Sequence, residues 1–182
     1  EIVIPSEYNG LPVTEIGYGA FRGCQSIISI IVPSSVTNIG DWAFYYCKGI
    51  TSITISEGLL SIGKNSFGEC SNLISIIIPD SVTSVGDSAF YNCSHIINIT
   101  ISSRVTSICE NVFAGCSSLT NITIPHGVTN IDEYAFIGCS SLTSITIPSS
   151  VTSIGNCAFY SCSSLTSITI PYKVTSIGDQ IL

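Results

Sequence analysis

A single interval of 23 residues organises this chain from end to end. All seven phenylalanines and seven of the nine cysteines keep that interval, which is the signature of a repeat architecture. Seven full units occupy residues 13–173, with a partial opening unit over 1–12 and a truncated unit over 174–182. No linker interrupts the series, so we expect one solenoid domain over 1–182. The recurring residues, which we expect to form a structural ladder, are Phe21, Phe44, Phe67, Phe90, Phe113, Phe136 and Phe159, with Cys24, Cys47, Cys70, Cys93, Cys116, Cys139 and Cys162.

The unit over 151–173 divides into a strand and a compact segment. Residues 165–170 alternate apolar and hydroxyl side chains, which is typical of a half-buried strand. Pro171 ends the run because proline has no N–H for a strand ladder. Phe159 and Cys162 have the spacing of one helical turn, so we expect a short helical turn there. Acidic residues at the start of this segment in several units suit the N-terminal end of such a turn.

The units must stack on one another to bury their apolar side chains. A 23-residue unit is too short to enclose its own apolar side chains, whereas stacked units bury each inward residue against its equivalent on the next coil. Parallel strands about 4.8 Å apart would carry these residues into one continuous apolar column. For the unit over 82–104 the predicted inward residues are Val82, Val85, Ala89, Phe90, Cys93, Ile96, Ile99 and Ile101.

The repeat can be written Leu-x-x-Ile-x-Ile-Pro-x-x-Val-x-x-Ile-Gly-x-x-Ala-Phe-x-x-Cys over about residues 13–178. Its best copies run from Leu142 to Cys162 and from Leu119 to Cys139. This pattern resembles the BspA-like class of leucine-rich repeats. The resemblance implies an α/β solenoid, namely a curved right-handed coil with a parallel β-sheet on its concave face and short strands and short helical turns on its convex side. It also implies an extracellular or cell-surface protein of bacteria or protists that binds other proteins or cells.

Charge and hydropathy exclude two classes of partner. Five Lys plus Arg stand against twelve Asp plus Glu, so no basic stripe is available to neutralise the phosphates of a nucleic acid or an anionic membrane. The mean hydropathy of +0.54 is high, but the longest apolar stretches are far shorter than the roughly 20 residues that span a bilayer. We therefore expect neither nucleic-acid binding nor membrane insertion.

Catalytic and metal-binding patterns are absent from the sequence. His95 and His126 do not share a repeat position, and neither lies in a nucleophile–base–acid pattern. No Cys-x-x-Cys pair suggests zinc. One carboxylate per coil cannot supply the six to eight oxygens that calcium prefers, so we interpret the acidic row as a solvated flank. We expect no enzyme activity, cofactor or metal. That acidic row is Asp41, Asp87, Glu110, Glu133 and Asp179.

The nine cysteines divide into a regular set and two exceptions. The seven regular thiols would point the same way from coil to coil, with parallel Cβ vectors that do not suit a disulfide. We interpret them as reduced, buried thiols that act as small apolar residues. Cys109 stands where other units have glycine, and Cys157 stands at a variable position. For Cys109 and Cys157, a reactive role and a passive role both remain open.

The outward positions of the predicted strands form the candidate contact surface. In the N-terminal half these positions carry isoleucines, whereas the C-terminal half carries Ser and Thr. An exposed apolar patch beside polar residues is expected at a protein-contact surface, although β-branched residues also serve strand propensity alone. Glycans on the sequons at Asn98 and Asn121 would cover this face, and Asn92 starts a third sequon. The candidate partner-binding residues are Ile28, Ile31, Ile74, Ile77, Ile97, Asn98, Thr100, Asn121, Thr123, Thr146 and Thr169.

Aromatic residues gather next to the phenylalanine row. Tyr45, Tyr91 and Tyr160 share one repeat position directly after the phenylalanine, and Trp42 and Tyr46 lie close by. Tyr and Trp are over-represented in binding hot spots, but these residues equally suit a role in shielding the edge of the phenylalanine row.

We predict a non-enzymatic protein-binding or adhesion module whose partner is a protein or glycoprotein of a host or matrix. The alternative is a structural spacer with no ligand of its own. The chain begins Glu1-Ile2 without an initiator Met, so we expect a mature or excised piece. Ends that cut through a unit expose apolar edges, which predicts end-to-end self-association.

Overall fold

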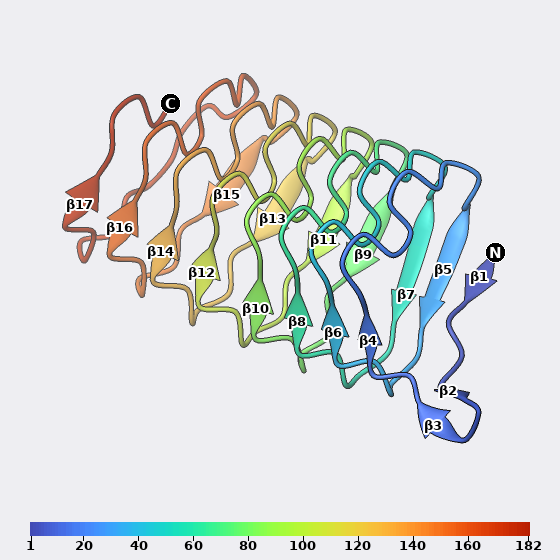
Figure 1. The fold of residues 1–182 in the computed structure, drawn as a ribbon. Helices are drawn as coiled ribbons and strands as arrows, with labels where there is room; N and C mark the ends of the chain where they lie inside the picture. The colour runs from blue at the N-terminus through green and yellow to red at the C-terminus, as the bar shows by residue number, and fades with distance from the viewer.

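The computed structural model describes residues 1–182 as a solenoid of about seven turns (Figure 1). Each coil adds one strand to each of two parallel sheets on different sides of the solenoid. The long-strand sheet contains β1 (Ile2–Val3), β5 (Ser29–Val32), β7 (Ser52–Ile55), β9 (Ser75–Ile77) and β11 (Asn98–Thr100), then the pair β13 (Asn121–Thr123) and β15 (Ser144–Thr146).

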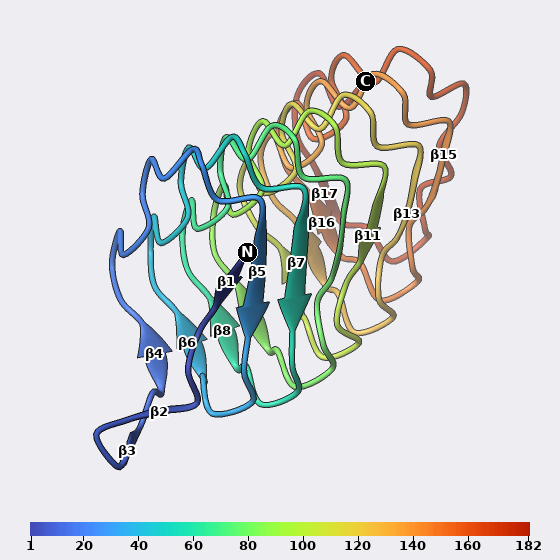
Figure 2. The ribbon, with the colours of Figure 1, turned by 90° about the vertical axis from the view of Figure 1, so that its right-hand side faces the viewer.

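The second, short-strand sheet consists of two-residue strands. It contains β4 (Glu15–Ile16), β6 (Asn38–Ile39), β8 (Ser61–Ile62) and β10 (Ser84–Val85), then β12 (Ser107–Ile108), β14 (Asn130–Ile131), β16 (Ser153–Ile154) and β17 (Ser176–Ile177). An antiparallel hairpin of β2 (Glu7–Tyr8) and β3 (Leu11–Pro12) projects from the first coil (Figure 2).

The register of both sheets places each residue beside its own repeat equivalent. Ile30 pairs with Ile53 in the long-strand sheet, and Ile39 pairs with Ile62 in the short-strand sheet. Equivalent side chains therefore lie on top of one another, as the spacing requires. All eight inward residues predicted for the unit over 82–104 are buried. The strand expected over 165–170 is not formed, because these residues make no ladder pairing with β15.

The expectation of an α/β solenoid with short helical turns is wrong, because the structure contains no helix and is a β-solenoid. In the segment over 41–47 every second N–H bonds to the next coil. The N–H of Phe44 donates to the carbonyl of Ser66 at 2.8 Å, while the N–H of Tyr45 donates to that of Trp42, only three residues back. A helix would direct each of these N–H groups to the carbonyl four residues earlier.

This segment recurs in each coil, and we call the resulting stack of β-turns the turn ladder. It runs along the top of Figure 1 between the two sheets. Two residues of each segment adopt positive φ, for example Asn65 at 52° and Glu69 at 62°, which breaks any helical path. The expected helix-capping role of the acidic row is also wrong at Asp41, because its Oδ1 accepts from the N–H of Lys64 on the next coil at 2.8 Å.

The phenylalanine rings form one continuous stack through the core. Ring centroids of neighbouring coils lie between 5.1 Å, for Phe21 and Phe44, and 5.9 Å, for Phe90 and Phe113. The rings from Phe44 onward are buried, and the planes of Phe44 and Phe67 differ by only 5°. Offset stacking of this kind adds to the burial of apolar area.

The regular cysteines pack beside this stack as free thiols. The Sγ of Cys70 donates to the carbonyl of Phe44 on the preceding coil at 3.2 Å, and the same contact recurs in the coils that follow. That carbonyl also accepts the N–H of Cys47. A thiol is small enough for this site and supplies a donor that alanine would lack. All nine cysteines are free, and Cys24 on the first coil is exposed.

We expect Phe90→Ala to lower the free energy of unfolding by about 3–5 kcal/mol, because it removes one fully buried ring and leaves a cavity in the stack. Chemical denaturation measures the loss. Tyr172→Ala is the matched control, since it truncates an aromatic side chain that is 87% exposed. A loss below about 1 kcal/mol for Phe90→Ala would contradict burial of the ring.

The thiol ladder predicts loss of stability at alkaline pH. Burial raises the pKa of Cys47 to about 11 and that of Cys116 to about 12. Unfolded thiols ionise above about pH 8.5, so the unfolded state then binds fewer protons than the folded state. The stability contribution of each thiol whose pKa is raised is therefore complete below that pH. It falls as pH rises toward the folded pKa value, by about 1.4 kcal/mol per pH unit. Denaturation between pH 7 and pH 10.5 should show a shallower decline for Cys116→Ala. Identical slopes would refute the account.

Candidate functional site

The outer face of the long-strand sheet, here called the long-strand face, carries no charged side chain on its strands. Alternation along each strand buries one set of side chains and exposes the other, as for Asn98 and Thr100 on either side of buried Ile99. All eleven candidate partner-binding residues are exposed except Ile31, which is half-buried. Their role in binding remains a prediction.

Exposed isoleucines concentrate on the N-terminal half of this face. Ile28 and Ile77 are 60% and 68% exposed, and Ile74 and Ile97 also face solvent. Val3 joins them, because β1 pairs Val3 with Ile31. Ile2-Val3-Ile4-Pro5 carries the strand pattern of the later units, but Val3 is not among the candidate residues because hairpin β2–β3 lengthens the first coil and shifts Val3 from the regular interval. These residues define the apolar patch, namely Val3, Ile28, Ile31, Ile74, Ile77 and Ile97.

At one coil interface, between the units over 82–104 and 105–127, the pairing of both sheets is interrupted, and we call this interface the seam. The short-strand sheet ends at β10 and starts again at β12. At the other interfaces the residue equivalent to Cys109 donates its N–H to the preceding coil, as Gly86 does to Ile62 at 2.8 Å. Cys109 makes no such bond, and neither does Thr106, although Thr83 and Thr129 do.

The long-strand sheet is interrupted at the same interface. No ladder pairing joins β11 to β13, and the N–H of Thr120 lies 3.5 Å from the carbonyl of Ile97, against 2.8 Å for the equivalent Thr51–Ile28 bond. The turn ladder is intact there, because the N–H of Phe90 still donates to the carbonyl of Val112 at 3.0 Å. The two coils therefore stand apart along both sheets and stay joined at the turn ladder.

Two side-chain features distinguish the coil that follows the seam from the other coils. Cys109 occupies a row of glycines that pack on the preceding backbone, where a Cβ at Gly86 would lie 2.7 Å from the nitrogen of Lys64. Asp132, in the same row, keeps its bond to the carbonyl of Ile108 at 2.8 Å, so a side chain alone does not open an interface. The Oγ of Ser107 donates to Asp132 at 3.1 Å and binds this coil to the following one.

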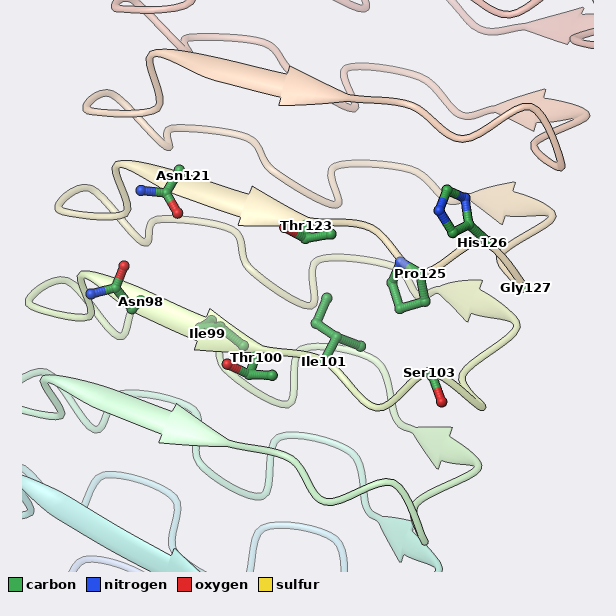
Figure 3. Close-up of a pocket in the computed structure, with 10 residues that line it drawn as sticks. All are labelled: Asn98, Ile99, Thr100, Ile101, Ser103, Asn121, Thr123, Pro125, His126 and Gly127. Carbon is green, nitrogen blue, oxygen red and sulfur yellow. The ribbon is translucent and has the colours of Figure 1, made fainter.

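The seam opens on the long-strand face as a depression of about 550 Å³. Figure 3 shows Asn98 and Thr100 from β11 and Asn121 and Thr123 from β13 along it. It therefore brings together four of the candidate partner-binding residues. Ile97 directly precedes Asn98 at the edge of the depression, the other isoleucine candidates lie on earlier coils, and Thr146 and Thr169 lie on later ones. Sequence reasoning missed the remaining polar rim, which comes from the loops after the strands. This rim contains Ser103, Pro125, His126 and Gly127.

A sequence signal for this rim does exist. The row directly after the proline position reads Ser34, Glu57, Asp80, Ser103, His126, Ser149 and Tyr172. It varies in chemistry from coil to coil more than any row on the strands, as expected for positions free of the stacking constraint. The depression has uncharged amide and hydroxyl groups around buried Ile99 and Ile101. It can form hydrogen bonds and apolar contacts with a partner, and it contains no Asp, Glu, Lys or Arg side chain.

The other residues singled out from the sequence do not converge. Nδ1 of His95 lies 2.6 Å from the carbonyl of Ser71, far along the chain from the His126 rim. Asp87 forms an ion pair with Lys64 at 2.7 Å. No group of three or more His, Cys, Asp or Glu side chains is placed to hold a metal ion. None of the structure's elements is a helix with the length and hydropathy to cross a membrane.

Comparison with known proteins shows which family has this architecture. The family described as BspA type Leucine rich repeat region matches residues 1–117 and 84–182, with six copies. The chain belongs to this BspA-type leucine-rich repeat family. The family predicted from the sequence pattern is thereby confirmed. No curated protein matches the chain.

Solved structures of BspA-type relatives agree over most of the chain. A leucine rich cell surface protein from Faecalibacterium prausnitzii is 38% identical with a TM-score of 0.85, over 92% of this chain and 46% of that one. A leucine-rich repeat protein of T. pallidum is 31% identical with a TM-score of 0.86, over 91% of this chain and 78% of that one. A leucine-rich repeat protein from Bacteroides ovatus is 28% identical with a TM-score of 0.73, over 97% of this chain and 53% of that one. The BspA-type chain thus spans about half the length of the first of these proteins.

Missing hydrogen bonds at the seam predict fast amide exchange. The amides of Thr106 and Cys109 should have protection factors at least about tenfold lower than those of Thr129 and Asp132, which occupy the same rows and keep their bonds. Hydrogen–deuterium exchange followed residue by residue measures this difference. Equal protection of the two pairs would show that the coils are joined at this interface as at the others.

Proposed function

We propose that this chain is a non-enzymatic protein-binding module of a cell-surface or secreted protein, and that the long-strand face contacts a protein or glycoprotein partner. The observation that carries the proposal is the apolar patch. Four of its isoleucines are 43–68% exposed, at positions where the coil of β7 and the later coils carry Thr. Strand propensity alone would be served equally well by Thr.

The apolar patch and the depression would act as parts of one contact surface. The patch ends at β11, where the depression begins, so Ile97 lies next to Asn98 at its edge. An apolar centre beside polar groups that form hydrogen bonds is the usual anatomy of an interface. Since the face is uncharged, association through it should depend little on ionic strength, unlike binding through exposed ion pairs.

The relatives support the proposed location. One structural relative is named a leucine rich cell surface protein, and leucine-rich repeat proteins are generally protein-interaction modules. This chain covers 46% of that relative, so the activity of any longer protein is inferred from this part alone. The alternative function is a spacer, in which regular stacking holds other parts of a protein apart and the isoleucines contact nothing.

An adhesion assay separates these functions. Beads carrying the protein are scored for attachment to epithelial cell monolayers and to basement-membrane matrix. The triple variant Ile74→Asp, Ile77→Asp, Ile97→Asp should reduce attachment by about tenfold or more, because three carboxylates would be desolvated at the contact. Thermal unfolding should be little changed, since these side chains are exposed.

The repeat supplies a matched control. Thr129→Asp, Thr152→Asp, Thr175→Asp places three charges at exposed positions directly before β14, β16 and β17, beside the short-strand sheet and away from the long-strand face. This variant should retain most of the attachment. Equal attachment by both variants and the unaltered protein would favour the spacer.

A further inference from the structure

A second surface, on the turn ladder of the first coils, combines aromatic rings with two cations. The guanidinium of Arg22 lies 5.0 Å from the ring centroid of Trp42 and 5.4 Å from that of Tyr45. Trp42 and Tyr45 pack edge to face at 4.6 Å, and Tyr46 follows at 6.3 Å from Tyr45. Nζ of Lys48 lies 4.3 Å from the Tyr46 ring. We call these five residues the aromatic–cation cluster.

Both cations of the cluster lack an acidic partner. The structure contains one ion pair, between Lys64 and Asp87, and neither Arg22 nor Lys48 donates a side-chain hydrogen bond. This is notable in a chain with twelve carboxylates and only five Lys plus Arg. The nearby carboxylate of Glu69 is held instead by Nδ2 of Asn92 at 3.0 Å. The N–H donors of Arg22 and Lys48 are therefore free to bind an anion, while the rings fix their position.

The backbone beneath the cluster is in an unfavourable conformation for its side chains. Trp42 and Tyr46 have φ of 60° and 62°, a region that bulky residues rarely adopt. At the same two positions the first coil has Gly19 and Gly23, and most later coils have Gly, Asn or Ser. Stacking of the coils therefore does not require aromatic residues here.

We propose that the aromatic–cation cluster binds an acidic peptide segment of a partner protein, with carboxylates at both ends and an apolar or aromatic residue between them. Arg, Trp and Tyr are the residue types that dominate binding hot spots. The two cations at opposite ends of the row of rings match two separated carboxylates. A sulfated polysaccharide carries many closely spaced charges and would call for a longer run of Lys and Arg than this cluster offers.

Trp42 is the only tryptophan of the chain, so its fluorescence reports on this surface alone. An acetylated peptide with two Glu residues flanking two Phe residues should change the emission in a saturable manner. Its analogue with Gln in place of Glu should bind roughly tenfold more weakly. A substitution next to Trp42 can alter the tryptophan emission even without peptide. For such variants, the fluorescence anisotropy of a labelled peptide measures the affinity instead. Arg22→Gln and Lys48→Gln should each weaken binding roughly threefold to fivefold.

Two controls define the outcome. Lys173→Gln removes an exposed charge at the other end of the chain and should leave the affinity unchanged. The Ile74→Asp, Ile77→Asp, Ile97→Asp variant should also bind the peptide normally, because the long-strand face is a separate surface. Equal affinity for the Glu and Gln peptides, or no effect of Arg22→Gln in a protein with unaltered melting, would overturn the proposal. So would binding of heparin without binding of the peptide.

Discussion

Hydrogen bonding between equivalent residues of successive coils is the interaction on which this structure depends. It operates on three sides of the solenoid, because two parallel sheets and the turn ladder all direct backbone N–H groups to the neighbouring coil. The thiols extend the same principle to side chains, since the phenylalanine carbonyl accepts both the N–H of its own coil's cysteine and the S–H of the next coil's cysteine. Like residues are thereby brought into contact, and the phenylalanine stack follows from it.

Because each coil contacts only its neighbours, departures from the repeat have local effects. Ser66 stands where most other units have alanine, and its buried Oγ has no hydrogen-bond partner. Ser102 replaces the usual proline, and its Oγ donates to the carbonyl of Val82 at 2.6 Å instead. Only at the seam is the pairing of both sheets interrupted. There the coils separate along both sheets, and the depression on the long-strand face results.

The two proposed contact surfaces differ in their physics. The long-strand face is uncharged, and its contribution would come from burial of the apolar patch and from hydrogen bonds around the depression. The aromatic–cation cluster would act through charge on a row of rings, and would weaken as salt screens it. They lie on different sides of the coil, so one module could engage two chemically distinct segments of a partner.

The repeat spacing and the alternation within each unit were sufficient to predict the family and most of the buried residues, because both patterns are properties of short stretches of chain. Cys24, expected to be buried like its equivalents, is exposed. The turn at Phe159 could not be told from a helix by spacing alone, since its N–H partners lie on the next coil, 22 residues away. The alignment of Val3 with Ile31 likewise depends on the hairpin β2–β3. The sequence by itself thus determined which side chains face inward and which face out. Only the tertiary structure decided where neighbouring coils separate and which exposed side chains meet, because both depend on contacts between residues far apart in the chain.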